Sequence, residues 1–411
     1  MTARVLVVGG GGREHALCLA LARDAAVGSL VCAPGNAGTA HVAESRPLDV
    51  ADPHAVAALA TEVRADHVVI GPEIPLVAGA ADALRARDVP TFGPSAAAAR
   101  LEGSKAFAKD VMAAAGVPTA RSEAHRDAAG ALAALERFAA PYVVKADGLA
   151  AGKGVVVTAD LGEARRHVLA CCGDGGDGGG VGGVVLEDFL DGPEVSLLAI
   201  VDERGGVHPL LPARDHKRVG DGDTGPNTGG MGAVAPVDLD LDRVRREVLE
   251  PTVAEMAQRG TPFAGVLYAG LALTTRGPQV IEFNARFGDP ETQTLLTLLD
   301  APLLAVLRGE AEPAWRAGAA VTVVLAAHGY PAEPRLGDAV CGLSAASADP
   351  AVTVHHAGTR RESDGRVVSA AGRVLAVTAT GVDLAAARGS AYAGLARLRL
   401  DGGHARSDIG G

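Results

Sequence analysis

The most informative pattern in the chain is an alternation of apolar and polar residues between Val280 and Arg286. Neighbouring side chains of a β-strand point to opposite faces of the sheet. The apolar positions, expected to pack inward, are Ile281, Phe283 and Ala285. The polar positions, expected to share the other face, are Glu282, Asn284 and Arg286. Because Mg²⁺ accepts carboxylate and amide oxygens and a guanidinium attracts anions, this face predicts a cation and anion site.

The residues after this strand predict a tight turn and a helix. Asp289 is expected to be the N-cap, Pro290 the first helical residue and Glu291 an acid of the first turn, with the helix continuing over Thr292–Leu299. Ligands often bind where strands end and helices begin. For an isolated Glu-x-Asn-x-Arg string, an internal Glu–Arg ion pair in a buried edge strand is the simpler interpretation. The assignment therefore depends on the rest of the chain.

Apolar runs separated by Ala-, Leu- and Arg-rich stretches predict a parallel α/β unit before residue 100. The expected strands are Val5–Val8, Leu30–Ala33, His67–Ile70 and Val89–Phe92. The glycine-rich loops that follow them suit a phosphate-bearing ligand. A dinucleotide site is not expected, because Glu14 or His15 occupies the third glycine position of G-x-G-x-x-G. For the first loop alone, a simple tight turn explains the glycines equally well.

The remaining pattern predicts three further parts of the chain. The expected domains are 1–100 (N-terminal parallel α/β), 101–190 (linker helices and a lid lobe), 191–312 (a central lobe with the metal site) and 313–411 (C-terminal α+β). Ser95 and Ser104 are expected to cap two short helices. Other helices are expected over Lys105–Ala115, 128–138, 241–258 and Leu384–Leu398, and strands over Tyr142–Lys145, Val155–Thr158, Val321–Ala326, Ala351–His355 and Arg373–Thr378. The low-complexity tract Gly173–Gly183 predicts a mobile surface loop.

A second candidate phosphate site follows the apolar run that ends at Lys145. Its loop contains three glycines and another lysine, namely Gly148, Gly152, Gly154 and Lys153. Backbone N–H groups and ammonium charges bind polyphosphates. The spacing is not that of a Walker P-loop, so a β-hairpin that closes over phosphates is expected. A flexible hairpin with solvated lysines is the alternative, which the position of Lys145 after an apolar run disfavours.

Two polar segments complete the candidate chemistry. Glu187 and Glu194 flank a turn and could serve adenine and ribose, although acids beside a turn are usually only solvated. The stretch 215–232 is rich in glycine, donors and acceptors, which favours an ordered functional loop over disorder. It lacks the spacing of an EF-hand calcium loop.

Composition narrows the classes of partner. The chain has 411 residues, which suits about three domains, and a net charge of −11, which argues against general nucleic-acid or anionic-membrane binding. Its five cysteines lack metal-ligand spacing and are expected to be reduced thiols. The chain shows no signal peptide and no apolar window long enough for a membrane span. A soluble cytoplasmic protein is expected.

The lysine–glycine hairpin, the segment Glu187–Glu194 and the strand Glu282-x-Asn284 resemble, in this order, the nucleotide site of ATP-grasp ligases. Longer strings are similar to the phosphoribosylamine-glycine ligase family, also called glycinamide ribonucleotide synthetases. These strings are Gly11–Ala16, Ala33–Gly38, Leu101–Lys105, Lys145–Lys153, Asp215–Arg218, Thr224–Gly232 and Ile281–Glu291. The resemblance extends from about Val5 to Ile409. It implies an α/β fold, α+β in part, with a Rossmann-like N-terminal domain, a two-lobed ATP-grasp region and a small β-rich C-terminal domain.

The resemblance implies an ATP-dependent step of purine synthesis. Glycine would form a glycyl phosphate with the γ-phosphate of ATP, and the amine of 5-phosphoribosylamine would then attack it. The implied partners are these small molecules, without nucleic acid or membrane, and a monomer is expected. Two alternatives stay open at this point: another ATP-grasp carboxylate-amine ligase or carboxylase, and a non-catalytic nucleotide-binding protein.

The resemblance also implies roles for particular residues. ATP is expected to contact Lys105, Lys145, Gly148, Gly152, Lys153, Gly154, Glu187, Phe189, Leu190, Glu194 and Asn227. The other substrates are expected to contact Gly10, Gly11, Gly12, Asn36, Glu73, Asp215, Thr228, Gly230 and Arg286. Mg²⁺ or Mn²⁺ is expected at Glu282 and Asn284, and the catalytic residues are expected to be Arg286, Lys145, Asp215 and Lys217. The segment Tyr268–Ala272 lacks the further acidic metal ligand of many ATP-grasp enzymes.

Overall fold

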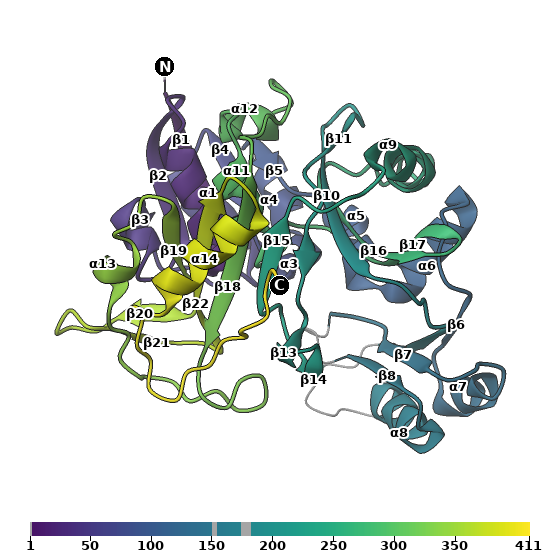
Figure 1. Cartoon of the computed structure of the whole chain (residues 1–411). Coiled ribbons are helices and arrows are strands. Elements are labelled where there is room, and N and C mark those ends of the chain that lie inside the picture. The colour runs from purple at the N-terminus through teal and green to yellow at the C-terminus, as the bar shows by residue number, and fades with distance from the viewer. Residues whose placement is uncertain (1, 150–153, 174–181) are drawn as a thin grey trace.

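The computed structural model describes residues 2–149, 154–173 and 182–411. Four sheets of four or five strands form the framework of the described part of the chain. Figure 1 shows the N-terminal and C-terminal sheets on one side of the molecule and the sheets of the central and lid lobes on the other. Gly152 and Lys153, with their predicted contacts, lie outside the described residues. So does most of the tract Gly173–Gly183, for which mobility was predicted. Within these residues, no helix has the length and apolarity needed to cross a bilayer.

The N-terminal domain is built on a parallel sheet of order β3-β2-β1-β4-β5. Its strands are β1 (Ala3–Gly9), β2 (Val27–Pro34), β3 (Glu44–Ser45), β4 (His67–Ile70) and β5 (Thr91–Phe92). Its helices are α1 (Gly12–Ala22), the 3₁₀ helix η1 (Thr39–His41), α2 (Pro53–Glu62), α3 (Glu73–Ala78) and α4 (Ala80–Arg85). The predicted strands are confirmed except that the last is shorter. Val89 donates its N–H to the carbonyl of Leu84 and Pro90 has no N–H, so pairing begins only at Thr91.

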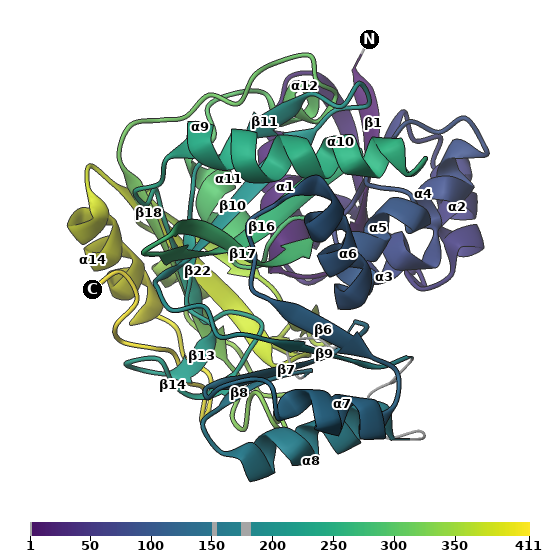
Figure 2. The ribbon, with the colours of Figure 1, turned by 90° about the vertical axis from the view of Figure 1, so that its right-hand side faces the viewer.

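Two capped helices lead into the lid lobe. Ser95 and Ser104 accept backbone N–H groups at the starts of α5 (Ala96–Gly103) and α6 (Lys105–Ala115), which confirms both predicted caps. The lid sheet is antiparallel with order β6-β9-β7-β8. Its elements are β6 (Ser122–His125), α7 (Ala128–Leu135), β7 (Tyr142–Ala146), β8 (Val155–Thr158), α8 (Leu161–Cys172) and β9 (Val184–Glu187). Figure 2 shows α7 and α8 on the side of this sheet away from the central lobe.

The central lobe contains an antiparallel sheet of order β11-β10-β16-β17. Its strands are β10 (Glu194–Val201), β11 (Val207–Pro209), β16 (Gly265–Thr274) and β17 (Gly277–Asn284). The predicted helix over 241–258 is present as α9 (Leu241–Val244), a π-helical turn (Arg245–Leu249) and α10 (Glu250–Gln258). The polar stretch after residue 213 is ordered, as predicted, and forms β12 (Arg214–Asp215), β13 (Arg218–Gly220), β14 (Thr224–Asn227) and β15 (Gly232–Ala235).

The C-terminal sheet crosses the predicted boundary at residue 313. Its order is β12-β15-β18-β22-β19, so strands from the central lobe pair with C-terminal ones. The C-terminal elements are β18 (Ala319–Ala326), α13 (Leu343–Ala346), β19 (Val352–His356), β20 (Thr359–Arg361), β21 (Val367–Ser369), β22 (Arg373–Gly381) and α14 (Leu384–Leu395). They are preceded by α11 (Glu291–Leu298) and α12 (Leu303–Leu307). The domain boundaries themselves stay predictions.

Helices α11 and α14 pack on opposite faces of β18. Thr322 of β18 shares a hydrogen bond of 2.7 Å with Thr294 of α11 and one of 2.8 Å with Thr378 of β22. The neighbouring residues Val321 and Val323 belong instead to the core that includes the buried face of α14. Alternation along one strand therefore joins the two helices to the same sheet.

The N-terminal and C-terminal domains meet at three buried histidines. The ring of His15 on α1 lies 5.9 Å from that of His355 and 5.6 Å from that of His356, measured between centroids. His15 Nδ1 accepts the backbone N–H of His356 at 2.8 Å. Both ring nitrogens of His355 are buried without a hydrogen-bond partner among the described residues. The ring of His355 is therefore positioned by packing, whereas those of His15 and His356 also make a hydrogen bond each.

Candidate active site

One cavity of about 1200 Å³ lies between the lid lobe, the central lobe and the C-terminal domain. It collects most residues that the sequence placed at a nucleotide and metal site. The predicted residues that line it are Glu73, Lys105, Lys145, Gly148, Gly154, Glu187, Phe189, Leu190, Glu194, Asp215, Lys217, Asn227, Thr228, Glu282, Asn284 and Arg286. Segments more than two hundred positions apart in the chain thus share one space.

The predicted substrate residues Gly10, Gly11, Gly12, Asn36 and Gly230 are not among the residues that line this cavity. The side chain of Asn36 is occupied by the backbone, because its amide donates to the carbonyls of Gly10 and His356 at 3.0 and 2.8 Å. Gly230 has a φ of +110°, and a Cβ there would lie 2.8 Å from Asp215 Oδ1 and 2.5 Å from Pro290. Their substrate contacts stay predictions.

Lys145 is buried in an ion-paired cluster on the lid side of the cavity. Its Nζ lies 3.0 Å from Glu187 Oε1 and donates to the carbonyl of Ile281 at 2.9 Å. The other oxygen of Glu187 lies 3.0 Å from Nζ of Lys109, which also donates to Thr119 at 2.8 Å. Burial lowers the pKa of Lys109, although Glu187 opposes the shift. The cluster fixes two ammonium groups at the junction of the lid and central sheets.

A β-bulge interrupts the alternation predicted for β17. Gly270 of β16 pairs with Glu282, but the next residue, Leu271, pairs with Val280, so Ile281 is the extra residue. Val280 is fully buried, whereas Ile281 lines the cavity. The prediction that Ile281 packs inward is therefore wrong. The bulge leaves its carbonyl free of the ladder, and Lys145 uses it.

Glu282 and Asn284 both line the cavity, as a cation site on this strand requires. Burial alone would raise the pKa of Glu282, but Lys217, Lys145 and Lys105 outweigh it and keep the carboxyl in its ionised form. The strand partner of Glu282 is Gly270, which offers no third ligand. Among the described residues, no group of three histidine, cysteine or acidic side chains is arranged for a metal ion.

Arg286 does not pair with Glu282, contrary to the simpler interpretation of the Glu-x-Asn-x-Arg string. Its Nε lies 3.2 Å from Glu73 of α3, and its Nη2 lies 3.1 Å from Glu102 of α5. Glu102 also accepts the backbone N–H of Ala285 at 2.8 Å. Burial opposes the charge of Arg286, but Glu102 and Glu73 raise its pKa further. The guanidinium is thereby held at the cavity wall by two other segments.

A buried acidic cluster lies beside Lys217. Tyr268 and Ser196 donate to Oε1 of Glu291 at 2.5 and 3.1 Å. Burial and the nearby Glu291 raise the pKa of Asp215 well above its ordinary value, and its Oδ1 is buried without a hydrogen-bond partner among the described residues. Lys217 lies 3.1 Å from Glu194. A cation placed between Asp215 and Glu291 would relieve their repulsion.

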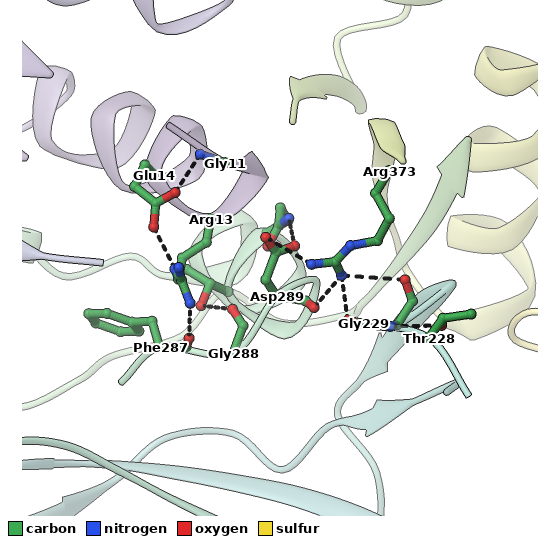
Figure 3. A network of polar contacts seen from close by, with 12 residues as sticks. Gly11, Arg13, Glu14, Thr228, Gly229, Phe287, Gly288, Asp289 and Arg373 are labelled. Carbon is green, nitrogen blue, oxygen red and sulfur yellow. Dashed lines mark hydrogen bonds and ion pairs between the residues drawn. The ribbon is translucent and has the colours of Figure 1, made fainter. Parts of the chain in front are cut away.

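Asp289 is not the helix N-cap that the sequence predicted. Helix α11 begins one residue later, with Pro290 as its N-cap and Glu291 as its first residue. Burial alone would raise the pKa of Asp289, but Arg373 and Arg13 outweigh it and lower that pKa. Arg373 also donates to the carbonyls of Asp289 at 2.6 Å and Gly229 at 2.5 Å (Figure 3).

Arg13 of α1 forms the other half of this network. It lies 2.5 Å from Oε1 of Glu14 and donates to the carbonyl of Phe287 at 3.0 Å (Figure 3). Oε2 of Glu14 accepts the N–H of Gly11 at 2.5 Å. The segment after β17 is therefore held from one side by the N-terminal domain and from the other by the C-terminal domain.

Three family models match consecutive parts of the chain. They are the phosphoribosylglycinamide synthetase N domain at residues 3–102, its ATP-grasp (A) domain at 103–292 and its C domain at 320–411. The chain belongs to the phosphoribosylglycinamide synthetase family. This finding confirms the resemblance and the fold class predicted from the sequence.

Relatives of this family match over nearly full length. The chain is 58% identical to the phosphoribosylamine–glycine ligase of Streptomyces coelicolor, over 99% of this chain and 98% of the relative. It is 56% identical to that of Mycobacterium tuberculosis, over 99% and 97%.

Solved structures agree with this assignment. The crystal structure of the phosphoribosylamine–glycine ligase of Thermotoga maritima matches with a TM-score of 0.85 and 34% identity, over 98% of this chain and 99% of that one. The biotin carboxylase domain of the Hydrogenobacter thermophilus 2-oxoglutarate carboxylase, solved with MgADP, matches with a TM-score of 0.73 at 16% identity, over 98% and 92%. That second likeness shows only the fold.

Several residues of this phosphoribosylglycinamide synthetase site had no predicted role in binding or catalysis. Those that line the cavity are Arg13, Glu102, Lys109, Tyr268, Asp289, Glu291, Arg373 and Arg406. Arg13 and Glu102 lie inside strings that carried the resemblance, so the strings themselves were a usable signal. Lys109 lies in an ordinary helical pattern, and Arg373 and Arg406 lie in the C-terminal domain, where no pattern pointed to a ligand. An enzyme of this family acts on small molecules and uses ATP, in agreement with the cavity.

Proposed function

We propose that the chain catalyses the ATP-dependent ligation of glycine to 5-phosphoribosylamine, giving glycinamide ribonucleotide, ADP and phosphate. The observation that carries the proposal is one cavity that collects Lys105, Lys145, Glu282, Asn284 and Arg286. Phosphoryl transfer requires such positioning and neutralisation of charge rather than a protein nucleophile. The names of the full-length relatives supply the substrates.

In the first step, a carboxylate oxygen of glycine attacks the γ-phosphorus of ATP, and the bond to the β–γ bridging oxygen breaks. ADP leaves and glycyl phosphate forms. Lys145, held by Glu187 and the carbonyl of Ile281, is positioned to neutralise phosphate oxygens, with Lys105 beside it. Lys105 Nζ donates to the carbonyl of Gly148 at 3.0 Å, which brings the lid loop to the same place.

In the second step, the amine of phosphoribosylamine attacks the carbonyl carbon of glycyl phosphate, phosphate leaves and the amine loses a proton. Arg286 is assigned to the charge on the acyl phosphate, because Glu73 and Glu102 hold its guanidinium at the cavity wall. Asp215 is assigned to the ammonium group of glycine. Its free oxygen and its repulsion with Glu291 support a bound cation there.

The residues present fit one Mg²⁺ or Mn²⁺. Glu282 is ionised and Asn284 offers an amide oxygen on the same cavity wall, and such ions complete their shell with water and substrate phosphates. The ion would supply neutralisation of phosphate charge. Glu187 and the chain to Leu190 are assigned to adenine and Glu194 to ribose, since these residues line the cavity on the lid side.

Product identification tests the proposal. The protein is incubated with Mg²⁺, ATP, glycine and phosphoribosylamine, and ADP, phosphate and glycinamide ribonucleotide are measured. We expect ADP release to require both glycine and phosphoribosylamine. ADP release that proceeds equally with another amino acid or with bicarbonate would contradict the assigned substrates.

We also propose a cytoplasmic monomer that binds neither nucleic acid nor membranes. The net charge of −11 supports the lack of polyanion binding. The five cysteines are free thiols, which agrees with a reducing compartment. Light scattering of the purified protein tests the monomer, and binding to DNA or anionic vesicles at low salt would contradict the proposed partners.

A further inference from the structure

The hairpin Arg218–Asn227 lacks a core of its own. It consists of β13, β14 and the turn between them, and none of its residues is buried. Asp223 in the turn adopts a φ of +53°, which is uncommon for a residue other than glycine. A two-stranded sheet is at best marginally stable by itself in water. The hairpin therefore needs support from elsewhere in the molecule.

This support comes from the C-terminal segment Arg406–Asp408. Among the described residues, every hydrogen bond and ion pair from the hairpin to residues beyond its own loop ends on this segment. Arg406 donates to the carbonyl of Arg218 at 3.1 Å and to Asp223 at 2.6 Å. Asp408 accepts the N–H of Gly222 at 2.8 Å, and Ser407 donates its backbone N–H to Asp221 at 2.8 Å.

The C-terminal segment is itself anchored in the C-terminal domain. Ile409 is fully buried in the core beneath α14. Arg388 of α14 donates to the carbonyls of Ser407 and Ile409 at 2.7 and 3.1 Å. Tyr392 of the same helix donates to the carbonyl of Arg406 at 2.9 Å. The hairpin is thus tied to a packed helix through the four consecutive residues Arg406–Ile409.

Arg406 is the central charge of this contact. Three carboxylates, those of Asp221, Asp223 and Asp408, surround the turn, and Arg406 pairs directly with the last two. Its side chain is only 2% exposed, whereas that of Asp223 is 68% exposed. A charge-assisted hydrogen bond from a planar guanidinium is stronger than a neutral one, and Arg406 makes four such donations at once, two of them to Asp408. Without it, the carboxylates would repel one another.

The hairpin borders the proposed active site. It begins directly after Lys217 and ends at Asn227, and both of these residues line the cavity together with Arg406 and Asp408. We propose that Arg406 is a positioning residue which holds the Arg218–Asn227 hairpin in place, so that Lys217 and Asn227 keep their positions at the substrates. The expected kinetic effects rest on the proposed function, whereas the support of the hairpin by Arg406 does not.

Hydrogen exchange measured by mass spectrometry tests the inference on the full-length protein without ligands. In Arg406→Gln, amides of residues 219–227 are expected to exchange about tenfold faster than in the wild type, because charge-assisted hydrogen bonds are lost. The control is Arg366→Gln, which removes an exposed ion pair with Asp364 at the turn of another hairpin, β20–β21. Exchange over 219–227 should not change in that control.

Unchanged exchange over 219–227 in Arg406→Gln would overturn the inference. If Arg406→Gln does not fold, Asp223→Asn replaces it, since this carboxylate is largely exposed and removing it deletes only one contact. A smaller acceleration over the same residues is then expected, and none would overturn the inference.

Steady-state kinetics separate positioning from stability. In Arg406→Gln, KM for glycine is expected to rise about tenfold while kcat stays within about threefold, because substrate must first order the hairpin. In Arg406→Lys, KM for glycine should rise less than in Arg406→Gln, since lysine keeps the charge but not the paired donors. An unchanged KM together with faster exchange would overturn the positioning role. If the wild type shows no glycine-dependent ADP release, the proposed function fails while the exchange result still stands.

Discussion

The cavity has two walls that are built in different ways. The strand wall consists of β7, β9 and β17 and carries Lys145, Glu187 and Glu282. Its backbone is fixed by sheet ladders, and Lys145 and Glu187 pair with each other at 4% and 3% exposure. The loop wall, residues 214–230, has only a few paired residues of its own, and Arg373 and Arg406 hold it from 144 and 183 positions away. Local pattern determines the first wall, and distant contacts determine the second.

Because the two walls are built differently, substitutions on them are expected to have different effects. On the strand wall, a substitution removes a charge from a framework that stays in position. On the loop wall, it releases a segment that has little else to hold it. The strand wall is therefore expected to control the rate of phosphoryl transfer, and the loop wall the apparent affinity for substrates.

The largest effect is expected for Glu282→Gln on the strand wall. We expect a loss on the order of 10³-fold in kcat/KM, because a ligand of the proposed cation and its charge are removed. Thermal unfolding should be little changed, since the ladder of β17 stays intact. The control is Glu247→Gln, at an exposed ion pair of the π-helical turn. Full activity in Glu282→Gln would contradict the role of Glu282 as a ligand of the proposed cation.

Arg286→Ala is expected to slow the chemical step by about 10²- to 10³-fold, or ~3–4 kcal/mol, as for other preorganised charge-stabilising donors. Single-turnover formation of glycinamide ribonucleotide measures this step. Because Glu73 and Glu102 lose their partner, thermal unfolding is measured in parallel. A rate within about tenfold of the wild type would refute the role of Arg286.

Arg373→Gln tests the loop wall. Its guanidinium donates to the carbonyls of Gly229 and Asp289, so its loss should loosen both segments. We expect KM to rise about tenfold, or ~1.4 kcal/mol, with a smaller change in kcat. Arg360→Gln, at an exposed ion pair with Glu362 in the same domain, is the control. A fall in kcat with an unchanged KM would show that Arg373 affects the rate of the reaction, as expected for the strand wall, and not substrate affinity.

The smallest effect on turnover concerns the buried histidines where the N-terminal and C-terminal domains meet. Burial is the main cause that lowers the pKa of His355 to about 3, with Arg23 and His356 adding to the shift. The folded protein thus binds fewer protons than the unfolded chain between about pH 6.5 and pH 3, so stability falls as pH decreases through this window. At pH 5 the loss attributable to this residue is ~2 kcal/mol relative to pH 7.

Denaturant unfolding at pH 7 and pH 5 checks this expectation. His355→Leu should reduce the difference in unfolding free energy between the two values, whereas the exposed His54→Gln should not. An equal difference in the wild type and His355→Leu would show that this imidazole does not contribute to the acid sensitivity.

The strand wall could be predicted from the sequence and the loop wall only in outline. Alternation placed Glu282 and Asn284 on one face, and the end of an apolar run marked Lys145. The bulge at Ile281 was missed because it depends on pairing with Gly270 and Leu271 of another strand. The alternation of apolar and polar residues within one strand does not reveal such a change in register with its neighbour.

The partners of Arg286 and Asp289 were missed for a related reason. Glu73, Glu102 and Arg373 reach these residues only after three domains have assembled. Asp289 resembled an N-cap because its sequence context, an acid before proline, is typical of one. In the structure, the opposite charges of Arg373 and Arg13 determine its role.

The hydroxyl chain of Thr294, Thr322 and Thr378 has a consequence for recombination between relatives. The family models of the ATP-grasp and C domains end at 292 and begin at 320, so a chimera joined between them would inherit α11 from one parent and β18 and β22 from the other. The three hydroxyls bond in sequence inside a fully buried layer. Since α14 packs on the other face of the same sheet, the unit that should be exchanged intact is therefore α11 together with the whole C domain, 291–411.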